Sequence, residues 1–218
     1  MSVEHEKRLA AEAAAQLVED GMKVGLGTGS TVAYLLRALA MRGLDVRCVA
    51  TSPATERAAR ELGINVVSFR GRGALSQLDI AIDGADQVAC SGWLVKGHGG
   101  AHTREKAVAA AADRFVVIVS SDKLVETLTP PVPLELLEFG LAATLRRLET
   151  VRLREVPLSP EGGAIADFTG PFGDPAELAA RLSSTAGVVE HGLFPPRMVS
   201  DVVVARGEQV ERIAPATR

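Results

Sequence analysis

Short apolar segments alternate with segments of helical spacing through residues 1–120, and this alternation constrains the fold more than any other feature of the chain. Phe115–Val119 is entirely apolar, and Leu78–Ile82 contains a single polar residue. Strands that are apolar on both faces are typical of a parallel sheet covered on both sides by helices. The sequence therefore predicts an α/β fold with a mostly parallel sheet.

The individual elements of this region follow from periodicity and from glycine positions. We expect strands at 23–27, 46–50, 64–69, 78–82 and 115–119, and helices at about 9–20, 32–41, 54–62 and 103–112. In an open parallel sheet, ligands bind at the carboxyl ends of the strands. The loops that follow Gly27, Ile82 and Lys96 are therefore expected to share one crevice.

The second half of the chain has a different pattern. The stretch Pro130–Pro133 interrupts the alternation and is a candidate domain boundary. Beyond it we expect strands at 151–156, 164–168, 188–191 and 202–205, and helices near 138–148 and after the capping residue Asp174. We predict a main catalytic domain of residues 1–129 with 202–218, and a smaller α+β lobe of residues 130–201 with a role in oligomerisation.

Composition excludes several classes of function. The net charge is −3 and aromatic residues make up 4% of the chain, so neither a basic nucleic-acid surface nor a base-stacking module is expected. The chain has no apolar run long enough for a membrane span, and its charged N-terminus does not resemble a signal peptide. Cys48 and Cys90 form no CxxC motif. We expect a cytoplasmic protein without membrane or nucleic-acid partners.

Gly25-Leu-Gly-Thr-Gly-Ser-Thr31 follows a predicted strand and opens a predicted helix. Glycine amides and small hydroxyls in this position suit a phosphate monoester. The segment matches neither a Walker A loop nor GxGxxG, because Ser30 stands at the third glycine. It can equally be an ordinary strand-to-helix turn that Ser30 or Thr31 caps.

Two further segments carry candidate chemistry. Asp83-Gly-Ala-Asp86 ends a strand, where its carboxylates can orient sugar hydroxyls, bind a metal or cap the next element. The segment Lys96–Lys106 is predicted to form a glycine-rich loop that leads into a helix, with Glu105 in the first turn of that helix. That glutamate is either a general base or a favourable first-turn residue.

Other charged and metal-binding side chains give weaker indications. His98, His102 and Glu105 have a spacing that could form a metal triad on a helix, but His98 lies among glycines and no HExxH motif is present. We therefore predict no metal site. Lys123 follows a strand and could neutralise a phosphorylated ligand, whereas Lys7 is most simply a surface lysine.

Taken together, these segments resemble the ribose-5-phosphate isomerase type A family over essentially the whole chain, in both order and spacing. The matching pieces are Gly25–Thr31, Thr51–Thr55 with Gly63-Ile64, Asp79–Asp86, Lys96-Gly97 with Thr103–Lys106, Ser121–Lys123, Pro131–Pro133 and Gly187–Phe194. The resemblance implies a Rossmann-like sheet domain with a smaller α+β lobe, in homodimers or homotetramers. It also implies a cofactor-free aldose–ketose isomerase of the pentose phosphate pathway, with a pentose phosphate as substrate.

The resemblance also assigns roles to residues of this chain. Glu105 would transfer the proton through a cis-enediolate, Lys96 would stabilise the oxyanion, and Asp83 or Asp86 would relay the hydroxyl proton. The implied substrate-binding residues are Lys7, Thr28, Gly29, Ser30, Thr31, Asp83, Gly84, Ala85, Asp86, Lys96, Gly97, His98, Gly99 and Lys123.

The chain departs from the family's usual pattern at four places. His98 interrupts the glycine run, His102 replaces Leu or a similar residue, Gln87 replaces Glu, and Ser159–Gly163 replaces a Thr-Asp-Asn-Gly-Asn turn. Three alternatives therefore stay open. They are an isomerase or epimerase of another sugar phosphate, a non-catalytic sugar-phosphate-binding regulator, and a CoA-transferase-like or nucleotide-binding enzyme.

Overall fold

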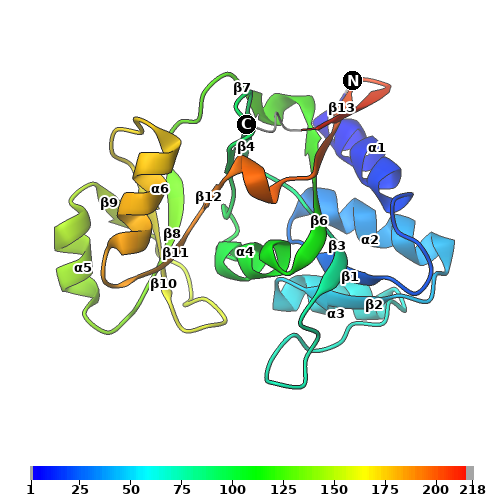
Figure 1. The fold of residues 1–218 in the computed structure, drawn as a ribbon, viewed down its shortest axis with the longest axis horizontal. Helices are drawn as coiled ribbons and strands as arrows, with labels where there is room; N and C mark the ends of the chain where they lie inside the picture. The colour runs from blue at the N-terminus through cyan, green and yellow to red at the C-terminus, as the bar shows by residue number, and fades with distance from the viewer. Residues whose placement is uncertain (1, 215–218) are drawn as a thin grey trace.

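The computed structural model describes residues 2–214, which form a main domain and a smaller lobe (Figure 1). The main domain contains a six-stranded sheet in the order β14-β13-β6-β3-β1-β2. Its strands are β1 Lys23–Leu26, β2 Arg47–Ala50, β3 Leu78–Asp83, β6 Ala112–Ser120, β13 Asp201–Arg206 and β14 Gln209–Ile213. All neighbours in this sheet are parallel except β13 and β14, so the predicted α/β fold with a mostly parallel sheet is confirmed.

Helices cover both faces of the sheet because successive side chains of its strands point to opposite sides. In β3, Ile80 and Ile82 pack with helices α1 Val3–Ala15 and α2 Ser30–Arg42, whereas Ala81 packs on the other face with α4 His102–Ala110. Helix α3 Pro53–Glu61 follows β2 on the α1 and α2 side. Burial on both faces explains why the central strands lack polar alternation.

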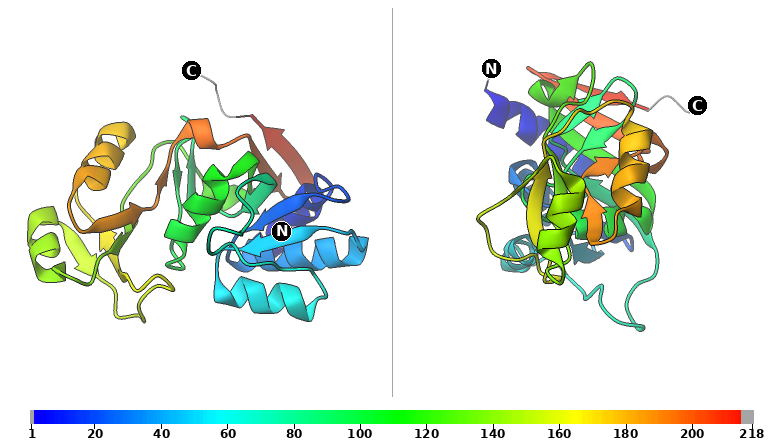
Figure 2. Two further views of the ribbon diagram at one scale, coloured as in Figure 1. Left: turned by 60° about the horizontal axis from the view of Figure 1, so that its bottom comes forward. Right: turned by 90° about the vertical axis from the view of Figure 1, so that its left-hand side faces the viewer.

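The smaller lobe lies at one end of the molecule (Figure 2). Its antiparallel sheet has the order β11-β8-β10-β9. The elements are β8 Val132–Leu136, α5 Leu141–Leu148, β9 Val151–Leu153, β10 Ala164–Phe168, α6 Pro175–Ser184 and β11 Val188–His191. Asp174 caps α6 as predicted, since its Oδ1 accepts hydrogen bonds from the amides of Ala176 and Glu177.

A third sheet of very short strands, in the order β12-β5-β4-β7, was absent from the sequence prediction. Its members are β4 Gln87–Ala89, β5 Leu94–Val95, β7 Leu124–Val125 and β12 Leu193–Phe194, and two 3-10 helices, η1 Ser121–Lys123 and η2 Pro196–Met198, adjoin them. Strand β12 returns from the small lobe and pairs with β5, directly before Lys96. This sheet therefore joins the small lobe to the candidate site.

Several predicted boundaries are wrong. The first helix ends at Ala15, and the strand predicted at 64–69 is reduced to a single bridge between Val66 and Cys48 at the edge of the sheet. The cap of α2 is Gly29, not Ser30 or Thr31, because a backbone φ of 121° at this position is open to glycine. The strand predicted at 151–156 ends at Leu153, and the helix predicted from 138 begins at Leu141.

Candidate active site

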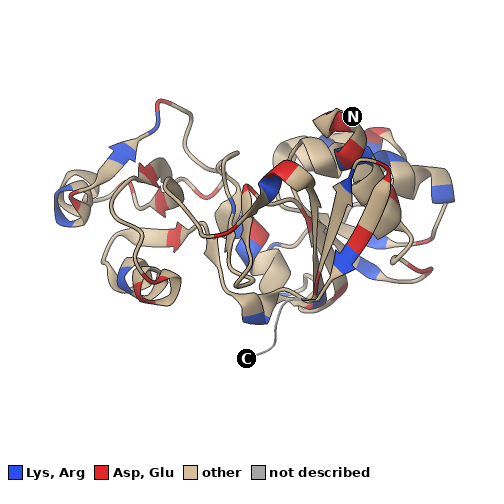
Figure 3. Cartoon of the chain, turned by 90° about the horizontal axis from the view of Figure 1, so that it is seen from above, with Lys and Arg blue, Asp and Glu red and all other residues tan. Residues whose placement is uncertain are grey.

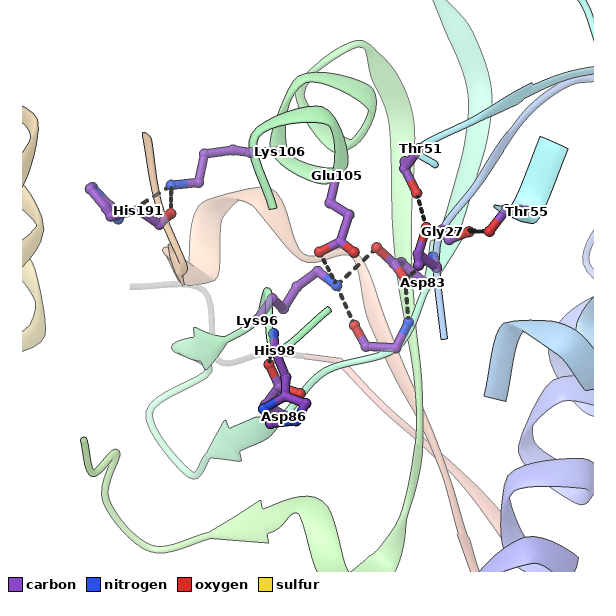
Figure 4. A network of polar contacts seen from close by, with 12 residues as sticks. Gly27, Thr51, Thr55, Asp83, Asp86, Lys96, His98, Glu105, Lys106 and His191 are labelled. Atoms are coloured by element: carbon purple, nitrogen blue, oxygen red, sulfur yellow. Dashed lines mark hydrogen bonds and ion pairs between the residues drawn. The ribbon is translucent and has the colours of Figure 1, made fainter. Parts of the chain in front are cut away.

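The loops that follow β1 and β3 meet at the carboxyl edge of the main sheet (Figure 4). The Thr28 amide donates a hydrogen bond to Asp83 Oδ1 at 3.0 Å, and the Gly84 amide donates to the same oxygen at 2.7 Å. Gly27 is required here, because a Cβ atom at this position would lie 1.9 Å from Asp83 Oδ1. The backbone therefore fixes the Asp83 carboxylate from two sides.

Asp83, Lys96 and Glu105 form a buried charged cluster at this edge. Lys96 Nζ lies 2.8 Å from Asp83 Oδ2 and 3.2 Å from Glu105 Oε2, and it also donates to the Gly84 carbonyl. The side chains of Lys96 and Glu105 are 3% and 5% exposed. Glu105 Oε2 has no hydrogen bond of good geometry within residues 2–214. One carboxylate oxygen thus sits beside a cation with no hydrogen-bond donor of good geometry committed to it in the described part of the chain.

The electrostatics of the cluster favour proton transfer by Glu105. Burial and the neighbouring Asp83 carboxylate raise the pKa of Glu105 to about 7, although Lys96 opposes the shift. Burial disfavours the charged form of Lys96, yet Asp83 and Glu105 hold its pKa above the ordinary value. A carboxyl group poised near neutral pH beside a permanent ammonium is a typical arrangement for general acid–base chemistry.

The threonines of the neighbouring loops form a hydroxyl network. Thr28 Oγ1 lies 2.8 Å from Thr51 Oγ1 and 3.3 Å from Thr55 Oγ1, and Thr55 Oγ1 donates to the Gly27 carbonyl. Thr51 and Thr55 come from the loop after β2 and the start of α3, and neither was expected from the sequence to have a role in the site. Their position directly after a predicted strand, in a segment shared with the family, was the available signal.

The remaining loop residues lie around the cluster. The His98 amide donates to Asp86 Oδ2 at 2.9 Å, and Gly97 adopts a φ of 100° against the His102 ring. Gly99 is exposed and Ala85 is half-buried. Asp86 also acts on Glu105 electrostatically, since its charge raises the Glu105 pKa.

The structure does not bring Lys7 and Lys123 into contact with the cluster. Lys7 Nζ pairs with Glu4 at 2.7 Å, and Lys123 Nζ pairs with Asp122 at 3.4 Å. The two lysines nevertheless lie on adjoining elements, because Glu6 of α1 accepts hydrogen bonds from the amide and hydroxyl of Ser121 in η1. Ser30 and Thr31 occupy the first turn of α2.

The sequence profile of ribose 5-phosphate isomerase A (phosphoriboisomerase A) matches residues 47–209. Ribose-5-phosphate isomerase A of Caulobacter sp. (strain K31) is 44% identical over 209 residues, which cover 89% of this chain and 91% of the relative. The chain belongs to the ribose 5-phosphate isomerase A family.

Solved structures of the ribose 5-phosphate isomerase A family agree over the whole fold. The enzyme from Neisseria gonorrhoeae has a TM-score of 0.92 at 31% identity and covers 99% of both chains. A D-ribose-5-phosphate isomerase solved in complex with phospho-erythronic acid has a TM-score of 0.91 at 33% identity, covering 98% of this chain and 100% of the other. The resemblance deduced from the motifs and the expected enzyme class are confirmed.

Two departures from the usual sequence of ribose 5-phosphate isomerase A have a structural account. His102 begins α4, is fully buried, and has no hydrogen bond to either ring nitrogen within the described residues. In the turn at 159–163, Ser159 joins Thr103 in donating to the buried Glu135 carboxylate, and Glu161 pairs with Arg104 at 2.8 Å. The altered turn thus contacts the first turn of α4, next to Glu105.

The histidines do not assemble a metal centre with Glu105. His98 is exposed while His102 is buried, and residues 2–214 contain no group of three or more His, Cys, Asp or Glu side chains placed to hold a metal ion. Within the same range, every helix is too short or too polar to cross a bilayer. Figure 3 shows Lys and Arg interspersed with Asp and Glu over both lobes.

Proposed function

We propose that the chain interconverts D-ribose 5-phosphate and D-ribulose 5-phosphate in the pentose phosphate pathway, with Glu105 as the acid–base catalyst. The observation that carries this proposal is the buried contact of Glu105 with Lys96, flanked by Asp83 at the carboxyl edge of the sheet. The family activity supports the reaction. A solved relative in complex with phospho-erythronic acid supports a phosphorylated sugar as the ligand.

The proposed reaction has two proton transfers at carbon. In the aldose-to-ketose direction, the Glu105 carboxylate removes the proton from C2, and the electron pair of that bond forms the C1–C2 double bond while O1 becomes negative. The hydroxyl proton of O2 then moves to O1, with Asp83 or Asp86 as the relay. Glu105 returns its proton to C1, and the O2 carbonyl forms. One carboxylate can serve both steps because it alternates between base and acid.

Lys96 is the proposed electrostatic stabiliser of the cis-enediolate. Its ammonium is held by Asp83 and Glu105 in a site almost closed to solvent, where a fixed charge acts more strongly than in water. Gly84, Ala85, Gly97, His98 and Gly99 would contact the sugar through the adjoining loops. Neither the proton transfers nor this stabilisation requires a metal or a nicotinamide.

The proposed phosphate site is the loop between β1 and α2. Thr28, Gly29, Ser30 and Thr31 present hydroxyls and the first amides of α2, which favour an anion. Lys7 and Lys123 would neutralise the phosphate from α1 and η1, after exchanging their present acidic partners for it.

The decisive experiment compares wild type with Glu105→Gln in the conversion of ribose 5-phosphate to ribulose 5-phosphate. We expect roughly a 10²- to 10⁴-fold loss of kcat in the variant, and wild-type turnover that a chelator leaves unchanged. Glu177→Gln is the matched control, because Glu177 occupies the first turn of α6 in the other lobe. Full activity of Glu105→Gln would exclude the assigned base, and binding without turnover by wild type would favour a regulator.

We also propose that the chain forms homodimers or homotetramers through the small lobe, residues 130–201. Large apolar side chains are exposed there, including Phe139 at 88% and Leu137 at 49%. Exposed apolar groups that lie close together on a surface are typical of protein interfaces. The cytoplasmic location remains a prediction from the sequence.

A further inference from the structure

The backbone of His98 is held from both lobes at once. Its amide donates to Asp86 Oδ2 of the main domain at 2.9 Å (Figure 4), and its carbonyl accepts a hydrogen bond from Arg154 Nη1 of the small lobe at 2.6 Å. His98 lies in the middle of the loop formed by Gly97–Gly99. A loop of glycines has little stiffness of its own. Apart from the turn hydrogen bond from the Gly100 amide to the Gly97 carbonyl, these two hydrogen bonds tie its backbone to the rest of the molecule.

Arg154 is itself fixed by a second small-lobe residue. Its Nε lies 2.8 Å from Asp167 Oδ2 and its Nη2 lies 2.6 Å from Asp167 Oδ1, which is a bidentate pair. The side chains of Arg154 and Asp167 are 15% and 8% exposed. Bidentate pairing immobilises a guanidinium and leaves its third nitrogen aimed in one direction, here at the His98 carbonyl.

We propose that Arg154 and Asp167 are positioning residues for the isomerase, which hold the loop Gly97–Gly99 in the orientation that receives the sugar. The small lobe then contributes to the active site through this arginine in addition to its role in assembly. The inference rests on the proposed function, since it assumes that the loop contacts substrate. Both hydrogen bonds are made by the backbone of His98, so they do not depend on its imidazole.

A cavity beside the loop explains why the hydrogen bond from Arg154 is needed to hold the loop in place. It has a volume of about 560 Å³, and its lining includes His98, Arg152, Arg154 and Asp167. Without the Arg154 hydrogen bond the loop has free space into which it can move. A displacement of about 1 Å at a substrate-contacting group can cost on the order of a hundredfold in rate.

The test separates positioning from stability by removing the buried pair completely. Replacing a buried ion pair with apolar residues is often neutral for stability, whereas removing one partner leaves an unpaired charge. We expect Arg154→Met and Asp167→Leu singly to lower Tm, and the double variant to recover it. The double variant should still show a roughly ten- to hundredfold fall in kcat/KM for ribose 5-phosphate, mainly through KM.

Arg152→Met is the matched control, because Arg152 lines the same cavity and has no side-chain partner within residues 2–214. We expect wild-type kinetics from Arg152→Met. We expect Arg154→Lys to have a KM between those of wild type and the double variant, because lysine keeps the positive charge but lacks the planar set of donors of the guanidinium. Hydrogen exchange of the His98 amide should accelerate in Arg154→Met and in the double variant, which both lack the Arg154 hydrogen bond, and should stay at the wild-type rate in Arg152→Met. An active wild type together with wild-type KM and exchange in the double variant would overturn the positioning role, whereas an inactive wild type would overturn the proposed function instead.

Discussion

Glu105 is the residue whose environment most directly predicts a measurable property. Burial and Asp83 raise its pKa to about 7, and only the ionised carboxylate can accept the C2 proton. Lys96 stays charged at that pH, because its pKa is raised. We therefore expect kcat to be low in acid and to rise with a midpoint near pH 7. A pH profile of kcat at saturating ribose 5-phosphate checks this, and a midpoint near the ordinary carboxyl value of 4.5 would contradict the described burial.

His102 leads to a second prediction, on stability. Burial and the Lys106 ammonium lower its pKa to about 4, against a weaker opposing effect of Glu190. Because the pKa of this imidazole is lower in the folded chain, its titration costs no stability above pH 6.5, and the fold loses stability as the pH falls from 6.5 towards 4, where the unfolded chain takes up the proton first. His102→Leu removes this loss and also removes two buried, unpaired nitrogens.

We expect His102→Leu to raise the free energy of unfolding by about 1 kcal/mol at pH 7 and by about 2–3 kcal/mol at pH 5. Denaturant unfolding at the two pH values measures both differences. A gap between variant and wild type that does not widen at pH 5 would show that His102 takes up its proton equally well in the folded chain.

Candidate site residues could be predicted from the sequence where they lie at the end of a predicted strand or at the start of a predicted helix. Asp83 at a strand end and Glu105 in a first helical turn were both found this way, and the structure places them around Lys96. The hydroxyls of Thr51 and Thr55 were missed, since isolated threonines have no diagnostic spacing. The burial of His102 was also beyond prediction, because it depends on packing against Gly97 across the loop.

At the scale of elements, long apolar strands were predictable and very short ones were not. Strands β3 and β6 are buried on both faces, and their runs of apolar residues predict strands from the sequence alone. Strands β5 and β12 have two residues each, which is too few for any periodic signal. Strand β8 begins at Val132, within the proline cluster 130–133 that was interpreted as a boundary. Tertiary pairing, not local sequence, defines these short strands.

The contact between the β1 loop and the end of β3 gives the element-scale prediction. Gly27→Ala would place a methyl group 1.9 Å from Asp83 Oδ1, and Asp83 cannot move without losing Lys96. We expect kcat to fall by about a hundredfold and Tm to drop. Gly73→Ala is the control, because a Cβ atom there meets no other atom within 4 Å. Equal activities in the two variants would mean that Asp83 has more freedom than its hydrogen bonds indicate.

At the scale of the whole molecule, the exposed apolar side chains predict how copies of the chain associate. Phe139 is 88% exposed and Leu137 is 49% exposed just after β8, and Val189 of the neighbouring strand β11 is 45% exposed. Burying such groups against a second copy would remove them from water, at roughly 25 cal/mol per Å² of apolar surface. An interface repeated by symmetry buries each of them in both copies.

We therefore expect light scattering to give a dimer or tetramer for wild type, and Phe139→Asp to shift the mass towards the monomer at low concentration. Met41→Asp is the matched control, because Met41 is 80% exposed on α2 in the main domain. A charge on the interface must be desolvated in two copies at once, whereas a charge on a free surface is not desolvated at all. If Phe139→Asp and Met41→Asp have the same mass as wild type at every concentration, the small lobe is not the assembly surface.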